Sequence, residues 1–149
     1  MEPVSELFQI DDDGHLFISP VISDWTVLSS RGIDTVIDLE GGLDQGVPQT
    51  PDEWLYIYFP ILDDNLPNER KLRCLTMMGA NLIRSGHRVL SHCSMGFNRS
   101  AFVAGLILYE LGMPGPAVVE RLRERRPGAL FNEKFADHLL GLPDPPRRA

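Results

Sequence analysis

Cys93 and Arg99 are the residues whose types and spacing best fit covalent chemistry on a phosphate group. They bound a glycine-containing loop in the segment VLSHCSMGFNRSA, which follows a hydrophobic run ending at His92 and precedes a helix opened by Ser100. A loop that leads into a helix N-terminus presents unpaired backbone N–H groups and the positive end of the helix dipole, and both favour a bound dianion. Gly96 lets such a loop curl without a Cβ clash. The segment therefore predicts a phosphate-binding loop.

The two ends of this loop have complementary chemical properties. The field at a helix N-terminus favours the thiolate of Cys93, which is the nucleophilic form of a cysteine. The planar guanidinium of Arg99 can hold two phosphoryl oxygens at once, a geometry that lysine does not reproduce. The alternative is that Cys93 is a core thiol and Arg99 a surface charge. The loop residues between them carry no charge, namely Ser94, Met95, Gly96, Phe97 and Asn98.

The run HCSMGFNRS resembles the H-C-x5-R-S/T signature of the cysteine-dependent protein tyrosine phosphatase superfamily. Low-molecular-weight phosphatases and arsenate reductases carry a similar loop near the N-terminus, whereas here helices follow it, so the chain up to about Leu142 resembles the dual-specificity phosphatase family. The resemblance implies that Ser100 hydrogen-bonds the cysteine and helps water attack a cysteinyl-phosphate, and that His92 braces the loop. From the residues alone, Ser100 also fits a helix cap and His92 an ordinary buried polar group.

The resemblance further implies an aspartate that protonates the leaving group, on a loop upstream of the nucleophile. In FPILDDNLPNE, Asp63 lies 30 residues and Asp64 29 residues before Cys93, similar to the family spacing. Asp63 stands three residues after Pro60, which matches the family pattern Pro-x-x-Asp better, so Asp63 is the preferred acid and Asp64 the alternative. The other interpretation is that both aspartates only turn the chain ahead of the next helix.

A second basic segment, RRPGALFNEKF, is similar to the family region whose asparagine steadies the phosphate loop. This likeness suggests Asn132 for that task and places Arg126 near the rim of the site. The arginines around it fit a solvated helix end equally well. Cys74 lies on an amphipathic helix and is expected to face the protein core. A regulatory disulfide between Cys74 and Cys93 is an alternative that the sequence leaves open.

The order of the expected elements predicts an α/β fold with a mostly parallel central sheet and helices on both sides. Strands have β-branched or aromatic runs bounded by glycine and proline, and helices have apolar spacing near 3.6 residues with capping residues at their ends. The expected strands are 15–19, 33–39, 54–59 and 87–92, and the expected helices are 25–30, 68–85, 100–111, 114–126 and 132–142.

Length and charge limit the kind of protein that this sequence encodes. The 149 residues fit one catalytic domain, 1–149, with 143–149 as a flexible tail. A net charge of −7 disfavours nucleic acid and anionic membranes as partners. The acidic N-terminus lacks a secretory signal and the longest apolar run falls short of the roughly 20 residues of a membrane span, so a cytoplasmic monomer is expected. The sequence offers no convincing His, Cys and carboxylate cluster, and neither metal nor other cofactor is expected.

The resulting expectation is a protein phosphatase that hydrolyses phosphotyrosine, and phosphoserine and phosphothreonine too, in proteins or small aryl phosphates through a cysteinyl-phosphate. Phosphoinositides are disfavoured because the loop lacks the lysines of relatives that act on them. One alternative is an RNA 5′-triphosphatase, since the run from Gly96 to Arg99 is similar to that branch. Another is a module that binds phosphorylated partners without turnover.

Overall fold

The computed structural model describes residues 6–146. The ends of the expected domain, 1–5 and 147–149, and with them the last part of the expected tail, lie outside the described residues. All nine predicted elements are present, with ends shifted by at most two residues. The strands are β1 (Phe8–Gln9), β2 (Leu16–Ser19), β3 (Thr35–Asp38), β4 (Leu55–Tyr58) and β5 (Val89–His92), and the helices are α1 (Trp25–Ser30), α2 (Glu69–Arg84), α3 (Arg99–Glu110), α4 (Gly115–Arg125) and α5 (Glu133–Leu140).

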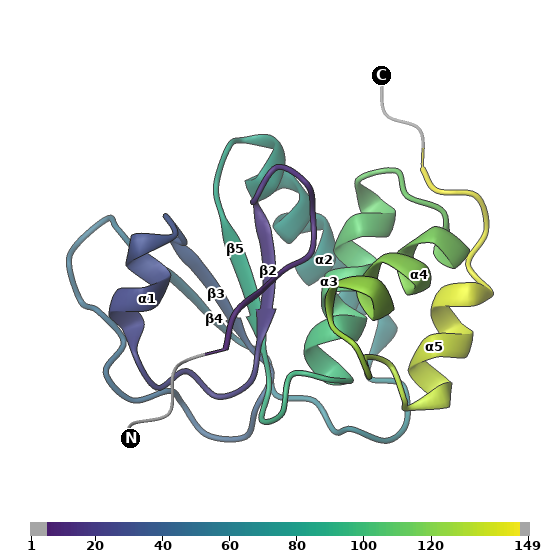
Figure 1. Ribbon diagram of the computed structural model, residues 1–149, viewed down its shortest axis with the longest axis horizontal. Coiled ribbons are helices and arrows are strands. Elements are labelled where there is room, and N and C mark those ends of the chain that lie inside the picture. The colour runs from purple at the N-terminus through teal and green to yellow at the C-terminus, as the bar shows by residue number, and fades with distance from the viewer. Residues whose placement is uncertain (1–5, 147–149) are drawn as a thin grey trace.

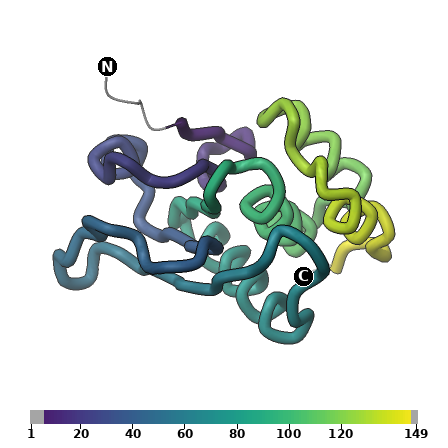
Figure 2. Tube along the Cα trace, turned by 90° about the horizontal axis from the view of Figure 1, so that it is seen from below, coloured from purple at the N-terminus to yellow at the C-terminus, as the bar shows by residue number. Residues whose placement is uncertain are grey.

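The five strands form one sheet in the order β1-β2-β5-β3-β4, in which only β1 pairs antiparallel to its neighbour. Ser19, His92 and Asp38 pair across the last row of β2, β5 and β3. Because these strands are parallel, the loops that follow them leave from the same edge of the sheet. Figure 1 shows this edge at the bottom of the molecule, and Figure 2 views it from below.

Helices cover both faces of the sheet, as predicted, but unequally. Figure 1 shows α1 alone on one side and α2 to α5 on the other. The smaller core, on the α1 side, includes Leu90, and the larger one includes Val89 and Cys93. Successive strand residues point to opposite faces of the sheet. Counting along β5 from Val89 and Leu90, His92 therefore points to the α1 side and Cys93 to the side of the large core.

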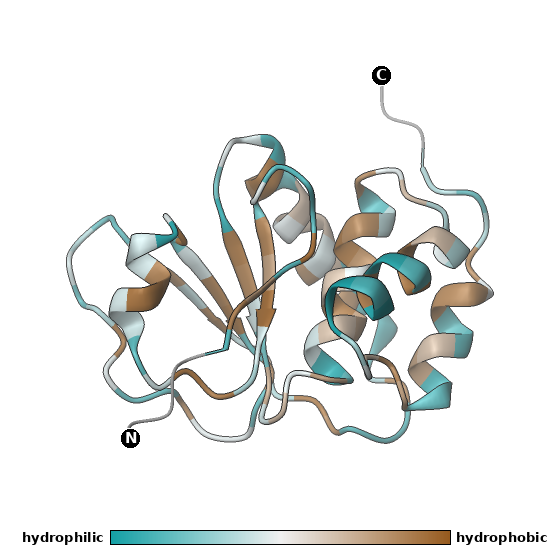
Figure 3. Ribbon diagram, in the orientation of Figure 1, coloured by the Kyte–Doolittle hydropathy of each residue, from teal (hydrophilic) through white to brown (hydrophobic). Residues whose placement is uncertain are grey.

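Helix α3 is the most buried helix, which the sequence predicted from its continuous apolar run. Phe102 and Ile107 are fully buried, and Figure 3 shows hydrophobic residues gathered on the central strands and on this helix, whereas α4 presents a hydrophilic outer surface. The first residue of α3, Arg99, is also the last residue of the phosphate loop. The loop is thus anchored to an element that the core holds in place. No helix in residues 6–146 is long and apolar enough to cross a membrane.

Three local expectations differ from the structure. Strand β1 was not predicted, because a two-residue strand carries no detectable period. Cys74 was expected in the core and is exposed on α2, so that prediction is wrong. Leu72, Leu75 and Met78 recur at helical spacing along the same helix, which predicts a buried Met78, but its side chain is 40% exposed. The buried face of α2 instead uses small residues, Gly79 and Ala80, which allow close packing.

Candidate active site

The backbone of the phosphate loop turns its carbonyl groups outward. Each carbonyl from residue 94 to residue 97 accepts a hydrogen bond from a group outside the loop, whereas within the described chain no acceptor is bound to the N–H of residues 94, 95, 97 and 98. With the carbonyls bonded on the outside, these amides are free to bind an anion. The outer bonds are Val21 N to Ser94 O (3.2 Å), Arg126 Nη2 to Met95 O (3.3 Å), Arg126 Nε to Gly96 O (3.2 Å) and Leu130 N to Phe97 O (2.9 Å).

Gly96 is required at the middle of this loop for two reasons. Its φ of +73° lies in the left-handed region that side chains disfavour. In addition, a Cβ at this position would lie 2.8 Å from Pro20 N and 2.9 Å from Ser19 C. The loop therefore packs tightly against the end of β2, which fixes its curvature.

Cys93 lies at the base of the loop, 2% exposed. Its Sγ is 3.3 Å from Ser100 Oγ and accepts a hydrogen bond of 3.3 Å from Gly96 N. Ser100 is fully buried, and its own carbonyl accepts a bond from Ser91 Oγ in β5. The structure thus brings together Cys93 and Ser100, two predicted site residues.

Arg99 is held by two partners from other loops. Its Nη2 donates to Glu40 Oε2 at 2.9 Å, and its Nη1 donates to the carbonyl of Ile61 at 3.3 Å. A guanidinium has five N–H groups, so these bonds orient the side chain and leave three donors for a ligand. Glu40 was not predicted as a site residue, because only the contact between two distant loops reveals its role.

Asp63, the preferred acid, is bound from two sides by asparagine amides. Asn98 of the phosphate loop donates to Asp63 Oδ2 and Asn132 donates to Asp63 Oδ1, both at 2.9 Å. Asn132 also accepts a hydrogen bond from Lys134 N and is the N-cap of α5. Asp64 points away and is 65% exposed, with Lys134 Nζ 3.2 Å from its carboxylate. The geometry thus places Asp63, rather than Asp64, against the loop.

His92 belongs to a buried polar network on the opposite face of the sheet from Cys93. Its Nε2 lies 2.6 Å from Asp44 Oδ2 and 3.3 Å from Asp38 Oδ1, while its Nδ1 is buried without a partner within residues 6–146. Tyr56 donates its hydroxyl to Asp38 and accepts a bond from Asp44 N. Burial raises the pKa of the Asp38 carboxyl, and burial together with the contact to Asp38 raises the pKa of Tyr56. The network fixes the residue directly before the nucleophile.

This network was missed in the sequence, which offered no convincing His and carboxylate cluster. Ligand atoms of Asp38, Asp44 and His92 lie within 4.8 Å of one another, so in geometry they could hold a cation. However, the His92 nitrogen that faces the two carboxylates is hydrogen-bonded to Asp44 and lies 3.3 Å from Asp38. The pairing of Asp38 with His92 across β3 and β5 would have revealed the cluster, but strand register is not readable from separate segments.

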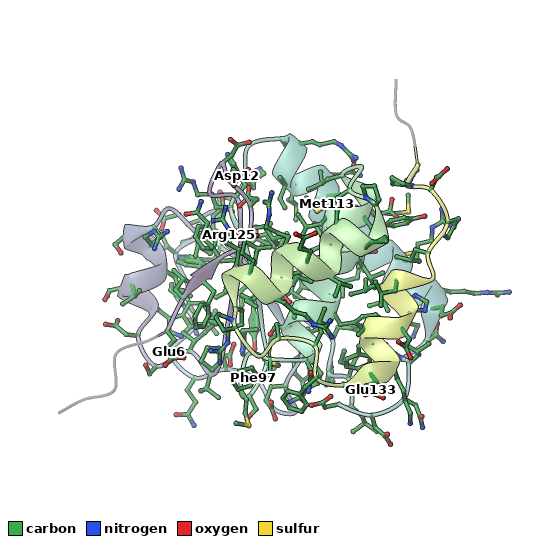
Figure 4. All side chains as sticks on the ribbon, turned by 45° about the vertical axis from the view of Figure 1, so that its right-hand side comes forward. Glu6, Asp12, Phe97, Met113, Arg125 and Glu133 are labelled. Carbon is green, nitrogen blue, oxygen red and sulfur yellow. The ribbon has the colours of Figure 1, made fainter. Side chains whose placement is uncertain are left out.

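The four arginines at the end of α4 are not a uniformly solvated helix end. Arg126 lies against the phosphate loop, with its guanidinium 3.9 Å from the Phe97 ring centroid and 4.3 Å from that of Phe8. Arg121 and Arg125 pair with Asp12, and Figure 4 shows Arg125 close to Asp12, far from the lower edge where Phe97 lies. Arg123 donates to two backbone carbonyls. Only Arg126 therefore reaches the site.

Comparisons with known proteins place the fold. No protein-family model and no curated protein matches the sequence. Tk-PTP in its active form is 26% identical, with a TM-score of 0.68 over 90% of this chain and 92% of that one. A mouse putative dual specificity phosphatase complexed with zinc tungstate is 22% identical (TM-score 0.74, 89% and 83%). The human tyrosine phosphatase-like serine/threonine/tyrosine-interacting protein is 23% identical (TM-score 0.71, 89% and 92%).

Proposed function

This chain belongs to the cysteine-dependent protein tyrosine phosphatase superfamily and has the dual-specificity phosphatase fold, and from that premise we propose that it is a protein phosphatase with Cys93 as its nucleophile. One observation carries the proposal. Two loops far apart in the sequence converge on one point: the phosphate loop carries Cys93, the amides and Arg99, and hydrogen bonds from Asn98 and Arg99 join it to the loop that carries Asp63. A nucleophile, an anion clamp and an acid in this arrangement are the requirements for cleaving a phosphate monoester.

In the first step, the Cys93 thiolate attacks phosphorus, so that an S–P bond forms while the bond from phosphorus to the leaving oxygen breaks. The unpaired loop amides and the three remaining donors of Arg99 hold the equatorial oxygens. Asp63 gives its proton to the departing oxygen. The two asparagine amides aim this carboxyl at the loop, which supports Asp63 over Asp64 for the task.

In the second step, water attacks the cysteinyl-phosphate. Asp63, now a carboxylate, takes a proton from the water, an O–P bond forms, and the S–P bond breaks to return the Cys93 thiolate and release phosphate. The hydroxyl of Ser100, 3.3 Å from Sγ, stabilises the thiolate as it leaves. Asn132 and Asn98 act as positioning residues in both steps, because they touch the acid and not the phosphorus.

Two other functions fit parts of the site. An RNA 5′-triphosphatase would share the loop but has less need of a positioned acid, and the net charge of −7 opposes RNA binding. A phosphate-binding module without turnover would not need Ser100 beside Cys93. The presence of Asp63 and Ser100 in hydrogen-bonded positions therefore favours the monoester phosphatase.

The proposal is tested by hydrolysis of a small aryl phosphate at mildly acidic pH, in the presence of a metal chelator. We expect turnover by the wild type, none by Cys93→Ser, and a reduced rate for Asp63→Ala that recovers with an activated leaving group. Absence of turnover in the folded and reduced protein would contradict the proposal. RNA 5′-triphosphate turnover that survives Asp63→Ala would favour the triphosphatase, and stoichiometric phosphopeptide binding without turnover would favour the module.

A further inference from the structure

Three large apolar side chains are exposed beside the phosphate loop. Leu62 is 78% exposed, Phe131 is 66% exposed and Met95 is 63% exposed. Single exposed apolar residues are ordinary on a protein surface and need no explanation. These three side chains differ because they come from three segments that meet at one place. The segments are the loop that carries Asp63, the turn before α5 and the phosphate loop. We call them the apolar rim.

Contacts between the three segments place the apolar rim at the mouth of the site. Leu62 directly precedes Asp63, which is bonded to Asn132, and Phe131 directly precedes Asn132. The Phe131 ring lies 5.8 Å, centroid to centroid, from the ring of Phe97 in the phosphate loop. Met95 is a residue of that loop. Figure 4 shows Phe97 and Glu133, which lie close in sequence to Met95 and Phe131, along the same lower edge of the molecule.

The cations described around the mouth are already paired. Arg126 donates to two carbonyls of the loop and packs on Phe97, and Lys134 bonds Asp64 and Asn65. Arg99 pairs with Glu40 and is expected to bind the one phosphate. The exposed charged side chains at the mouth include the carboxylates of Asp64 and Glu133. A second phosphate or an acidic residue beside the first would therefore meet like charge instead of a free cation.

We propose that the apolar rim selects phosphotyrosine flanked by apolar residues, and rejects phosphotyrosine flanked by acidic or phosphorylated residues. This inference rests on the proposed phosphatase function and adds its substrate preference. Apolar flanking side chains would cover Leu62 and Phe131 and remove their surface from water, which strengthens binding in proportion to the area covered. Acidic flanking residues would lose this gain and face the carboxylates of the mouth.

The test uses two phosphotyrosine peptides that differ only in flanking residues, leucine in one and glutamate in the other. The value of kcat/KM for each peptide is divided by that for a small aryl phosphate, which has no flanks. For the wild type we expect the leucine peptide to exceed the glutamate peptide by about tenfold or more. Phe131→Ser and Leu62→Ser should each lower the preference for the leucine peptide over the glutamate peptide about three- to tenfold. Met78→Ser, which removes an exposed apolar side chain from α2, should leave it unchanged.

The outcomes separate the two proposals. No turnover of the aryl phosphate contradicts the phosphatase function itself. Turnover of the aryl phosphate with equal rates on both peptides, or faster cleavage of the glutamate peptide, overturns the apolar preference alone. A concentration-dependent dimer that Phe131→Ser dissociates, with no change in the peptide ratio, would also overturn it, because the rim would then be an interface between copies. Thermal melting of each variant checks that it is folded.

Discussion

Two polar clusters flank the phosphate loop, and they are held in different ways. The buried network of Asp38, Asp44, Tyr56 and His92 lies under the loop on the α1 face, and His92 and Asp38 occupy paired positions in the sheet. The mouth cluster of Asp63, Asn98 and Asn132 lies on loops at the surface, and hydrogen bonds between side chains join it.

The difference corresponds to what each cluster must do. The residue beside a nucleophile has to stay fixed, and a position in the sheet surrounded by core is the most rigid one available. An acid must approach substrates of different size, and a loop held by two amides permits that movement. We therefore expect changes in the mouth cluster to alter catalysis more than stability, and changes in the buried network to alter stability more.

The largest effect is expected at the nucleophile between the two clusters. Cys93→Ser should lower kcat by roughly 10⁴-fold or more, because a serine hydroxyl is not ionised near neutral pH. The loop amides and Arg99 remain, so the variant should still bind tungstate or inorganic phosphate, measured by calorimetry. Loss of anion binding along with activity would mean that the substitution disrupts the loop rather than the chemistry.

The next largest effect is expected at the acid. Asp63→Ala should lower kcat on phosphotyrosine about 10²–10⁴-fold, and much less on a substrate whose leaving group needs no proton. Asp64→Ala is the matched control, because the Asp64 carboxylate is exposed and, among residues 6–146, is bonded only to Lys134. This variant should lower kcat less than about threefold. An equal loss in both variants would remove the distinction between the two aspartates.

A smaller effect is expected at Asn132, which both positions the acid and caps α5. One substitution can test the first role while it keeps the second. Asn132→Ser keeps an oxygen that can cap α5, since asparagine and serine cap about equally well, but loses the amide that donates to Asp63. We expect kcat on phosphotyrosine to fall about tenfold, the loss of one hydrogen bond to a charged group, while the free energy of unfolding stays unchanged. Unchanged kinetics would show that this amide does not position the acid.

The smallest effect concerns the buried network and appears in stability. Burial raises the pKa of Asp38 above its ordinary value, despite hydrogen bonds from Tyr56 and from Glu40 N. A carboxyl with a raised pKa in the folded state contributes stability below about pH 4, its unfolded value, and loses that contribution as pH rises through the folded pKa. Asp38→Asn should remove this decline.

Urea unfolding of the wild type and Asp38→Asn at several pH values checks this prediction. The free energy of unfolding of the variant minus that of the wild type should increase with pH across this window, by up to about 1.4 kcal/mol for each unit of pKa shift. A difference that does not depend on pH would contradict the raised pKa.

The sequence predicted features that depend on neighbouring residues. Helix α2 begins one residue after Asn68, whose side chain caps it, and ends before Gly86, whose φ is +92°. The phosphate loop was predicted because its strand, glycine and helix start are contiguous. The α/β fold followed from the alternation of strands and helices.

Features that depend on contacts between distant segments were not predicted. Glu40 reaches Arg99 across 59 positions, and Asp44 reaches His92 across 48. Cys74 was assigned to the wrong side of α2 because a thiol fits either the core or the surface, so its type did not determine its face. Loop contacts and helix rotation are set by tertiary packing, to which a single sequence gives no direct access.

The account depends most directly on a covalent intermediate at Cys93. We would mix the enzyme with a phosphotyrosine peptide labelled on the phosphate, quench within the first turnover, and locate the label in proteolytic fragments. The prediction is up to one phosphate per chain on the fragment that contains Cys93, with more label retained in a variant that hydrolyses the intermediate slowly, such as Ser100→Ala. Turnover without label on that fragment, or label on another residue, would contradict the assignment of Cys93 as nucleophile.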